Sequence, residues 1–350
     1  MAHKILILGA SYGSLLGTKL LMAGHDVTLV CRRKTAELIN AEGTVVRIKL
    51  KGEDEHRSIR SKDLPGHLSA CTPEDVQATD YDLVGLAMQE PQYAHHTIRM
   101  LLIRIAEERI PCLSIMNMPP LTFLKRIPGL DTSNLGASYT DPTVWDRFDP
   151  AMMTLCSPDP QAFRPPEEPS NVLHVGLPTN FKAARFEDEK ANALLLQLEA
   201  DIAAVRLDDK DVPVKLRVYD SLFVPLAKWS MLLTGNYRCI TRGEPRSIKE
   251  AVHGDLEQSR AIYEFVDTLA QRLGADPADG VPFEKYAAAA ESLLRPSSAA
   301  RAVASGAPFI ERVDVLVQLI AQSLDMSNPA IDETVKIVDD KLDANDPLPV

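Results

Sequence analysis

Short apolar segments alternate with helical patterns over residues 4–116, and this alternation restricts the fold more than any other feature of the chain. Ile5–Leu8 contains no polar residue, residues 13–23 have the spacing of a helix, and Val27–Val30 is again a strand-like segment. Such short apolar runs are typical of parallel strands that are buried on both faces. The pattern continues with a strand at 82–87, a helix at 92–108 and a strand at 112–116. We therefore predict an α/β fold with a Rossmann-type, doubly wound parallel sheet.

The 350 residues divide into two parts of different character. At about 150 residues per domain, this length suggests two domains. Residues 141–170 are rich in proline and lack periodicity, so we expect an inserted loop that helps to shape a binding pocket. From Asp211 onward the segments are rich in Ala and Leu and have helical spacing. We predict a Rossmann-like domain over 1–207 and a helical domain over 208–350, with a ligand cleft between them.

The charge and composition of the chain exclude several classes of partner. The 49 acidic residues outnumber the 38 Lys and Arg residues and give a formal net charge of -11, which repels nucleic acid and anionic lipid. The five cysteines are scattered, as is typical of a reduced protein. No apolar stretch approaches the roughly 20 residues of a membrane span, and no metal-binding His motif occurs. We expect a cytoplasmic protein with a small-molecule substrate, no metal, and no nucleic-acid or membrane partner.

A glycine-rich segment follows the first predicted strand and precedes the first predicted helix. It contains Gly9, Gly13 and Gly17, and Ser11 and Ser14 stand where a standard G-x-G-x-x-G motif has its second and third glycines. Small residues let the backbone approach a pyrophosphate, and the N-terminus of the helix attracts the anion. We therefore predict a dinucleotide-binding loop. Its candidate cofactor-binding residues are Gly9, Ser11, Tyr12, Gly13 and Ser14.

The residues after the second predicted strand distinguish between the two nicotinamide cofactors. An NAD enzyme usually has Asp or Glu there to bind the ribose hydroxyls, whereas this chain has Arg32-Arg33-Lys34. A guanidinium group can bind a 2′-phosphate with two hydrogen bonds. The sequence therefore predicts NADP as the cofactor, bound by Arg32 and Arg33.

Four motifs, spread over most of the chain, resemble the ketopantoate reductase family, whose helical second domain is similar to that of 6-phosphogluconate dehydrogenase. They are the glycine loop with the strand that ends at Arg32, Ser114–Asn117 at the end of a strand, Leu226–Trp229, and the segment from Arg295 to Glu311. The resemblance implies a reductase in which a lysine acts as acid and base. Hydride transfer to a carbonyl builds negative charge on its oxygen, and an ammonium group lowers that barrier.

The family's functional positions can be assigned to residues of this chain. The resemblance implies Lys228, Glu311 and Asn117 as catalytic residues, Asn236, Ser297 and Ser298 as substrate-binding residues, and Gln89 and Asn117 beside the cofactor. Several polar positions of the family are altered, because Leu232 replaces an Asn, Gln89 replaces a Lys, and Glu311 aligns only with a one-residue insertion. An unpaired buried polar group costs about 1–3 kcal/mol. We therefore expect a larger or less polar substrate than ketopantoate.

These observations favour an NADPH-dependent oxidoreductase that reduces a 2-keto acid-like carbonyl by hydride transfer in the interdomain cleft, and long Leu- and Ala-rich helices suggest a homodimer. Two alternatives remain. An opine-type dehydrogenase would perform reductive amination and would use a histidine, for which His253 is the candidate. A redox sensor would bind NADP without catalysis.

Overall fold

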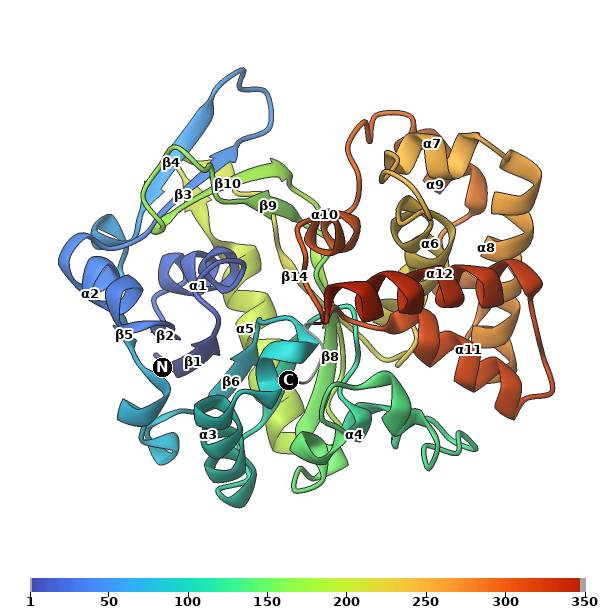
Figure 1. Ribbon diagram of the computed structural model, residues 1–350. Coiled ribbons are helices and arrows are strands. Elements are labelled where there is room, and N and C mark those ends of the chain that lie inside the picture. Colours follow the sequence, from blue (N-terminus) through green and yellow to red (C-terminus); the bar gives the residue numbers. More distant parts are fainter. Residues whose placement is uncertain (1, 347–350) are drawn as a thin grey trace. The chain divides into compact units, whose positions relative to one another are not determined.

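The computed structural model describes residues 2–346, which form two compact units (Figure 1). The first unit holds the described chain up to Met88, Gln92–Phe123 and Val144–Asp220. The second unit holds Gln89–Pro91, Leu124–Thr143 and the described chain from Ser221 onward. The first unit thus extends beyond the boundary predicted at residue 207, and two short earlier segments join the second unit.

An eight-stranded sheet with the order β14-β11-β8-β7-β6-β1-β2-β5 forms the centre of the first unit. The strands from β8 to β5 run parallel, as predicted, and β11 and β14 run in the opposite direction. Their bounds are β1 Lys4–Leu8, β2 Asp26–Val30, β5 Leu68–Cys71, β6 Leu83–Leu86, β7 Cys112–Ile115, β8 Met153–Ser157, β11 Phe181–Ala184 and β14 Leu216–Tyr219. The short apolar runs form the buried middle of this sheet, since Ile5 to Leu8 have 0% exposure.

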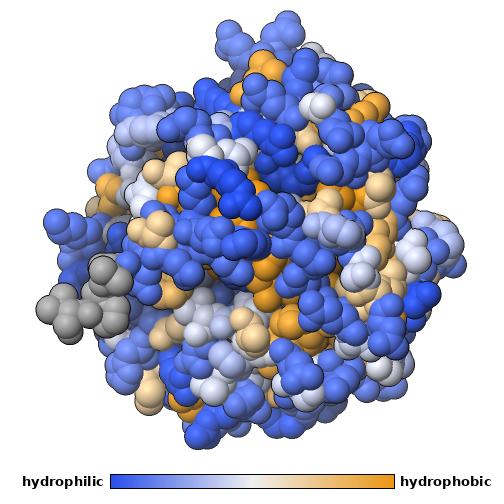
Figure 2. Space-filling view, turned by 45° about the vertical axis from the view of Figure 1, so that its right-hand side comes forward, coloured by the Kyte–Doolittle hydropathy of each residue, from blue (hydrophilic) through white to orange (hydrophobic). Residues whose placement is uncertain are grey.

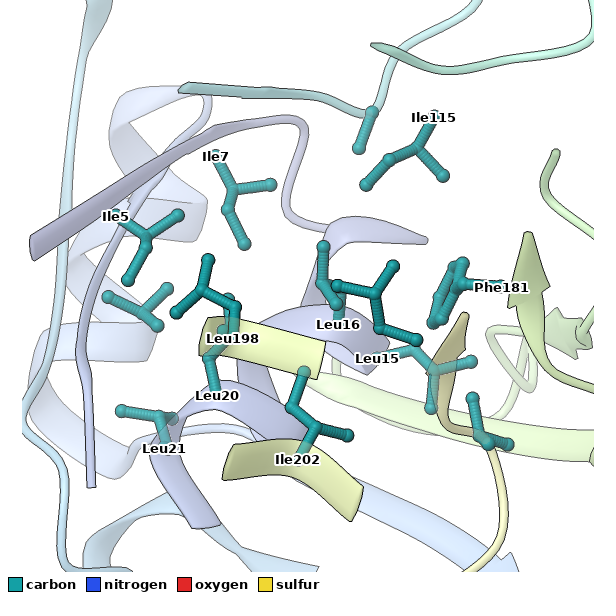
Figure 3. Packing of buried hydrophobic residues seen from close by; sticks show 14 of the residues in the cluster. Ile5, Ile7, Leu15, Leu16, Leu20, Leu21, Ile115, Phe181, Leu198 and Ile202 are labelled. Atoms are coloured by element: carbon teal, nitrogen blue, oxygen red, sulfur yellow. The ribbon is translucent and has the colours of Figure 1, made fainter. Parts of the chain in front are cut away.

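Helices α1 (Gly13–Met22) and α5 (Glu189–Ala204) pack against one face of this sheet. Leu16 and Leu20 of α1 contribute to the same hydrophobic cluster as Ile7 of β1 and Leu198 of α5 (Figure 3). Alternate side chains of a strand point to opposite faces, so the equally buried Leu6 and Leu8 show that the second face is covered too. The other longer helices of the first unit are α2 Arg33–Glu42 and α3 His96–Glu107.

A four-stranded sheet, β4-β3-β10-β9, lies beside the main sheet in the chain's first unit. Its strands are β3 Val45–Lys49, β4 His56–Arg60, β9 Gln161–Phe163 and β10 Val172–Leu177, and a separate hairpin joins β12 Arg206–Leu207 to β13 Lys210–Asp211. The prediction that residues 141–170 form a loop was wrong in part, because β8 and β9 lie within them. Pro150 and Pro158 stand on either side of β8 and leave its backbone donors intact.

The second unit has no strand in its described part and consists of helices, which confirms the predicted helical C-terminal region. Its main helices are α6 Lys228–Met231, α7 Ile248–His253, α8 Leu256–Arg272, α9 Phe283–Ala290, α10 Ser298–Ala304, α11 Val313–Ser323 and α12 Pro329–Asn345. Side chains cap several of them, as when Asp255 accepts a hydrogen bond from the backbone N–H of Gln258 at the start of α8.

The face in Figure 2 is mostly hydrophilic, and hydrophobic residues are visible between the hydrophilic ones, most of all near the centre of the view. Within residues 2–346, no helix combines the length and the hydrophobicity that a membrane span requires. Over the same residues, no group of three or more His, Cys, Asp and Glu side chains is arranged to hold a metal ion.

Candidate functional site

The loop after β1 makes a turn that only glycine accommodates at its first position. Gly9 has φ +107°, and a Cβ on this residue would lie 2.6 Å from the carbonyl oxygen of Ala87 at the end of β6. The backbone N–H of Gly9 donates to the carbonyl of Val30 at 3.0 Å, which ties the loop to the end of β2. The loop is therefore pressed against the ends of both neighbouring strands.

Helix α1 begins at Gly13, and its glycines let it approach the sheet closely. A Cβ on Gly13 would lie 2.5 Å from Cγ2 of Ile7, and one on Gly17 would lie 3.3 Å from Cγ1 of Val27. In dinucleotide-binding folds the third glycine of the motif has this packing role. Gly13 and Gly17 perform it here, which explains why a serine is tolerated at position 14.

The loop lies where the sheet changes its winding direction. Strand β1 pairs with β2 on one side and with β6 on the other, and β7 follows β6. Because these strands are parallel, Gly9, Arg32 and Asn117 follow the ends of their strands at one edge of the sheet. Open α/β sheets bind their ligands at this point. The first unit therefore places the glycine loop, Arg32 and Asn117 at one edge of the sheet, whereas Gln89 belongs to the second unit.

The loop offers backbone donors to an anion. Among the described residues, no protein acceptor bonds the backbone N–H of Ser11 or Tyr12, which precede the first turn of α1. Two predicted cofactor side chains are engaged elsewhere, because the Ser14 hydroxyl donates to the carbonyl of Ala10 and the Tyr12 hydroxyl donates to that of Pro160 at 2.7 Å. The glycine cradle and these N–H groups fit a pyrophosphate, so the backbone and not the side chains would bind it.

Arg32 and Arg33 lie at the start of α2 and are exposed. Arg32 makes no ion pair with any residue that the structure describes, and the residues that follow β2 carry no carboxylate. Asp75 lies near enough to Arg33 for the guanidinium to help lower the pKa of its carboxyl, although hydrogen bonds from Thr72 are the main cause. The two guanidinium groups are thus available at the position where a 2′-phosphate is bound in this fold.

In the second unit, Lys228 is the first residue of α6, which continues into a π-helical turn, Leu232–Asn236. A π-turn contains more residues than an α-turn, so one turn of each spans about the eight positions that separate Asn236 from Lys228. Asn236 therefore comes to the same side of the helix as Lys228. Single π-turns are frequent at functional sites. The π-turn was not predicted, since no sequence pattern specifies it.

Three further predicted residues lie in the second unit near this helix. The buried Ser297 hydroxyl donates to the carbonyl of Asn236 at 2.7 Å and caps α10 through Ala300, so its hydrogen bonds stay within the protein. Ser298 is exposed. The backbone of Glu311 accepts a hydrogen bond from the hydroxyl of Tyr237, the residue after Asn236. The segments that contain Asn236, Ser297 and Glu311 therefore lie side by side. Ser297 bonds the backbone of Asn236, and Tyr237 connects the Asn236 segment to the Glu311 segment.

Glu90 belongs to this part of the second unit and was missed by the sequence analysis. The residue is 2% exposed, and its carboxylate accepts hydrogen bonds from the backbone N–H and the hydroxyl of Thr140, at 3.1 and 2.9 Å. Burial raises the pKa of this carboxyl. The backbone N–H of Glu90 donates to Oε1 of Glu311 at 3.3 Å. The predicted residue Gln89 directly precedes Glu90 in the chain, so it lies next to a residue that contacts Glu311.

A glycine loop at the point where the sheet changes direction is the feature by which Rossmann-type α/β domains bind dinucleotides. Residues 5–98 match the family described as ketopantoate reductase PanE/ApbA. This match confirms the resemblance found in the sequence. No curated protein matches the chain in sequence.

Solved structures match the fold over nearly the whole chain. A 2-dehydropantoate 2-reductase from Methylococcus capsulatus matches with a TM-score of 0.67 and 13% identity, and the match covers 98% of each of the two chains. D-mandelate dehydrogenase, solved with NADH and anilino(oxo)acetate, has a TM-score of 0.65 and 15% identity over 98% of this chain and 99% of that one. A PanE/ApbA family ketopantoate reductase from Ralstonia eutropha JMP134 has a TM-score of 0.62 and 18% identity, with 98% and 100% covered. At these identities the likeness establishes the fold.

Proposed function

We propose that the protein is an NADPH-dependent reductase that acts on the carbonyl of a 2-keto acid-like substrate. The observation that carries the proposal is the glycine cradle of Gly9 and Gly13 at the end of β1, combined with exposed guanidinium groups, rather than a carboxylate, after β2. The cradle fits a pyrophosphate, and Arg32 and Arg33 fit a 2′-phosphate. The preference for NADP over NAD rests on these two arginines.

A bound nicotinamide cofactor would supply the hydride, and the chain's own residues would handle charge and protons. We assign to the Lys228 ammonium the role of donating a proton to the substrate oxygen as negative charge develops there. Asn236, on the same side of the helix, would hold the substrate by hydrogen bonds. Glu311 and Asn117 would orient the substrate or the lysine. Ser297 would act mainly as a helix cap, since both of its hydrogen bonds are made within the protein.

The substrate is expected to be less polar than ketopantoate. Leu232 is buried one turn after Lys228, where the family has an amide. An apolar side chain there removes a hydrogen bond for a hydroxylated substrate and offers an apolar surface to an apolar group. The structural match to D-mandelate dehydrogenase supports an aromatic 2-oxo acid, such as phenylglyoxylate, as the first compound to test.

The proposal is tested by following NADPH oxidation with a panel of 2-oxo acids that includes ketopantoate and phenylglyoxylate. Lys228→Ala should lower kcat about 100-fold or more, the usual contribution of general acid catalysis. Lys249→Ala, which removes a partly exposed lysine paired with Glu291, is the control and should leave kcat unchanged. NADPH binding without turnover of any compound would instead favour a sensor. Loss of activity in His253→Ala, with Lys228→Ala active, would favour reductive amination.

A further inference from the structure

The proline-rich segment contains a short strap, residues 158–164, that is bonded to the glycine loop. The Tyr12 hydroxyl donates to the carbonyl of Pro160 at 2.7 Å, and Nη2 of Arg164 donates to the carbonyl of Ala10 at 2.8 Å. Strand β9 holds the strap in place by pairing with β10. All of these contacts lie within the first unit. The strap therefore belongs to the loop that would bind the cofactor phosphates, and not to a disordered insert.

Arg164 is a half-buried cation at this loop. Desolvation lowers the pKa of its guanidinium, and the nearby Cys31 thiol opposes that change. Among the residues that the structure describes, no carboxylate forms an ion pair with Arg164, and Ala10 is its one hydrogen-bond acceptor. A guanidinium has five N–H donors, so most of them remain available for a ligand. A partly buried cation without an anionic partner is unfavourable, and a bound anion would relieve that cost.

The position of Arg164 indicates which anion it would bind. Ala10 follows Gly9 in the loop, and Cys31 directly precedes Arg32 at the end of β2. The guanidinium thus contacts the loop and lies near the residue that follows β2. In the dinucleotide-binding fold the adenosine ribose occupies this region, while the pyrophosphate lies over the N-terminus of α1.

We propose that Arg164 of the strap, together with Arg32, binds the 2′-phosphate of the cofactor and so determines the preference for NADPH over NADH. This inference rests on the proposed function, since it assigns a further residue to the same cofactor site. Arg32 approaches the phosphate from the start of α2, and Arg164 approaches it from the strap. Two guanidinium groups on different segments can bind one phosphate from two sides, which a single exposed arginine cannot do.

Isothermal titration calorimetry of the full chain with NADPH and NADH tests the assignment. Arg164→Gln should raise the Kd of NADPH about 10- to 100-fold, the loss expected for a charge-assisted hydrogen bond, and should change the Kd of NADH less than about threefold. Adenosine 2′,5′-bisphosphate and AMP, which differ only in the 2′-phosphate, should show the same contrast. Arg164→Lys keeps the charge and should recover part of the affinity for NADPH.

Two control variants separate the phosphate contact from a structural role of the strap. Tyr12→Phe removes the second hydrogen bond between the strap and the glycine loop. This change should affect the Kd of NADPH and the Kd of NADH equally. Arg147→Gln removes an exposed guanidinium paired with Glu107 and should affect neither. Equal losses for both cofactors in Arg164→Gln, or no loss, would overturn the assignment. If the unmodified protein binds neither cofactor, the proposed function fails and the assignment fails with it.

Discussion

Lys19 shows how much a single buried side chain can influence the stability of the first unit. It lies in α1 with 1% exposure, and its ammonium donates to the carbonyls of Val212 and Pro213 at 3.3 and 3.1 Å. Burial lowers the pKa of Lys19 from 10.5 to about 7, although Asp211 partly opposes this change. The acceptors belong to a turn in which Val214 adopts φ 63°, an unusual value for a β-branched residue.

Lys19 should make stability depend on pH in alkaline solution. Between pH 7 and about 10.5 the unfolded chain binds the lysine proton while the folded chain has lost it, so the free energy of unfolding rises with pH in this window. The rise in the free energy of unfolding attributable to Lys19 is about 5 kcal/mol across the whole window. The Lys19→Met variant should lack this rise in the free energy of unfolding. Urea unfolding at pH 7, 8.5 and 10 would measure the difference.

Lys62→Met is the matched control, because Lys62 is exposed and its ammonium donates to a single surface carbonyl, that of Ala41. This variant should keep the pH dependence of the unmodified protein. If the difference in the free energy of unfolding between Lys19→Met and the unmodified protein is the same at all three pH values, the pKa of Lys19 is not lowered by folding.

At the scale of elements, the π-turn after α6 depends on a contact with α9. The hydroxyl of Tyr286 donates to the carbonyl of Met231, just before the turn, at 3.1 Å. A Cβ on Gly235, within the turn, would lie 2.0 Å from that hydroxyl oxygen. A glycine is therefore required at position 235 because the tyrosine hydroxyl leaves no space for a Cβ, and not because of the backbone conformation. The turn that aligns Lys228 with Asn236 is stabilised from outside the helix.

The contact between Gly235 and Tyr286 can be tested with a double-mutant cycle. Gly235→Ala should destabilise the protein by about 1–3 kcal/mol through overpacking, and Tyr286→Phe by about 1 kcal/mol through loss of one hydrogen bond. Because the phenyl ring lacks the clashing oxygen, the double variant should lose less than the sum of both changes. Urea unfolding of the four proteins measures the coupling. Strict additivity would contradict the proposed clash.

For the whole molecule, the average charge and the charge around the glycine loop have opposite signs. The net charge is -11, yet Arg32, Arg33 and Arg164 are gathered near the glycine loop in the first unit. Exposed charges are screened by salt more strongly than half-buried ones. The preference for a 2′-phosphate should therefore weaken with salt, without disappearing. The homodimer expected from the sequence stays a prediction, which size-exclusion chromatography with light scattering can test.

Ligand binding to the folded protein should raise its unfolding temperature. At a concentration 100 times its Kd, NADPH should stabilise the protein by about 2.7 kcal/mol. NADH at the same concentration should stabilise it less, and raising NaCl from 50 to 500 mM should narrow the difference between them. Differential scanning calorimetry provides the measurement. Equal stabilisation by both nucleotides at low salt would contradict the preference for NADPH.

The sequence predicted those parts of the fold that depend on local pattern. Ile5–Leu8, the glycine loop and the helix after it were recognised because burial on both faces requires a continuous apolar run and the turn requires glycine. The strands β4 and β9 were missed, because they are short and half exposed and have few apolar residues. β8 was missed because the prolines on either side of it suggested a loop.

The sequence by itself determined the α/β class and the glycine loop with the helix after it, because each depends on neighbouring residues whose spacing is specific to one structure. Only the tertiary structure decided that Arg164 contacts Ala10, 154 positions earlier, and that Glu90 contacts Thr140, 50 positions later. Such contacts arise when strands and loops far apart in sequence are folded together, and no local periodicity encodes them. The candidate site therefore combines a locally encoded loop with charged residues that only the packing of the chain positions.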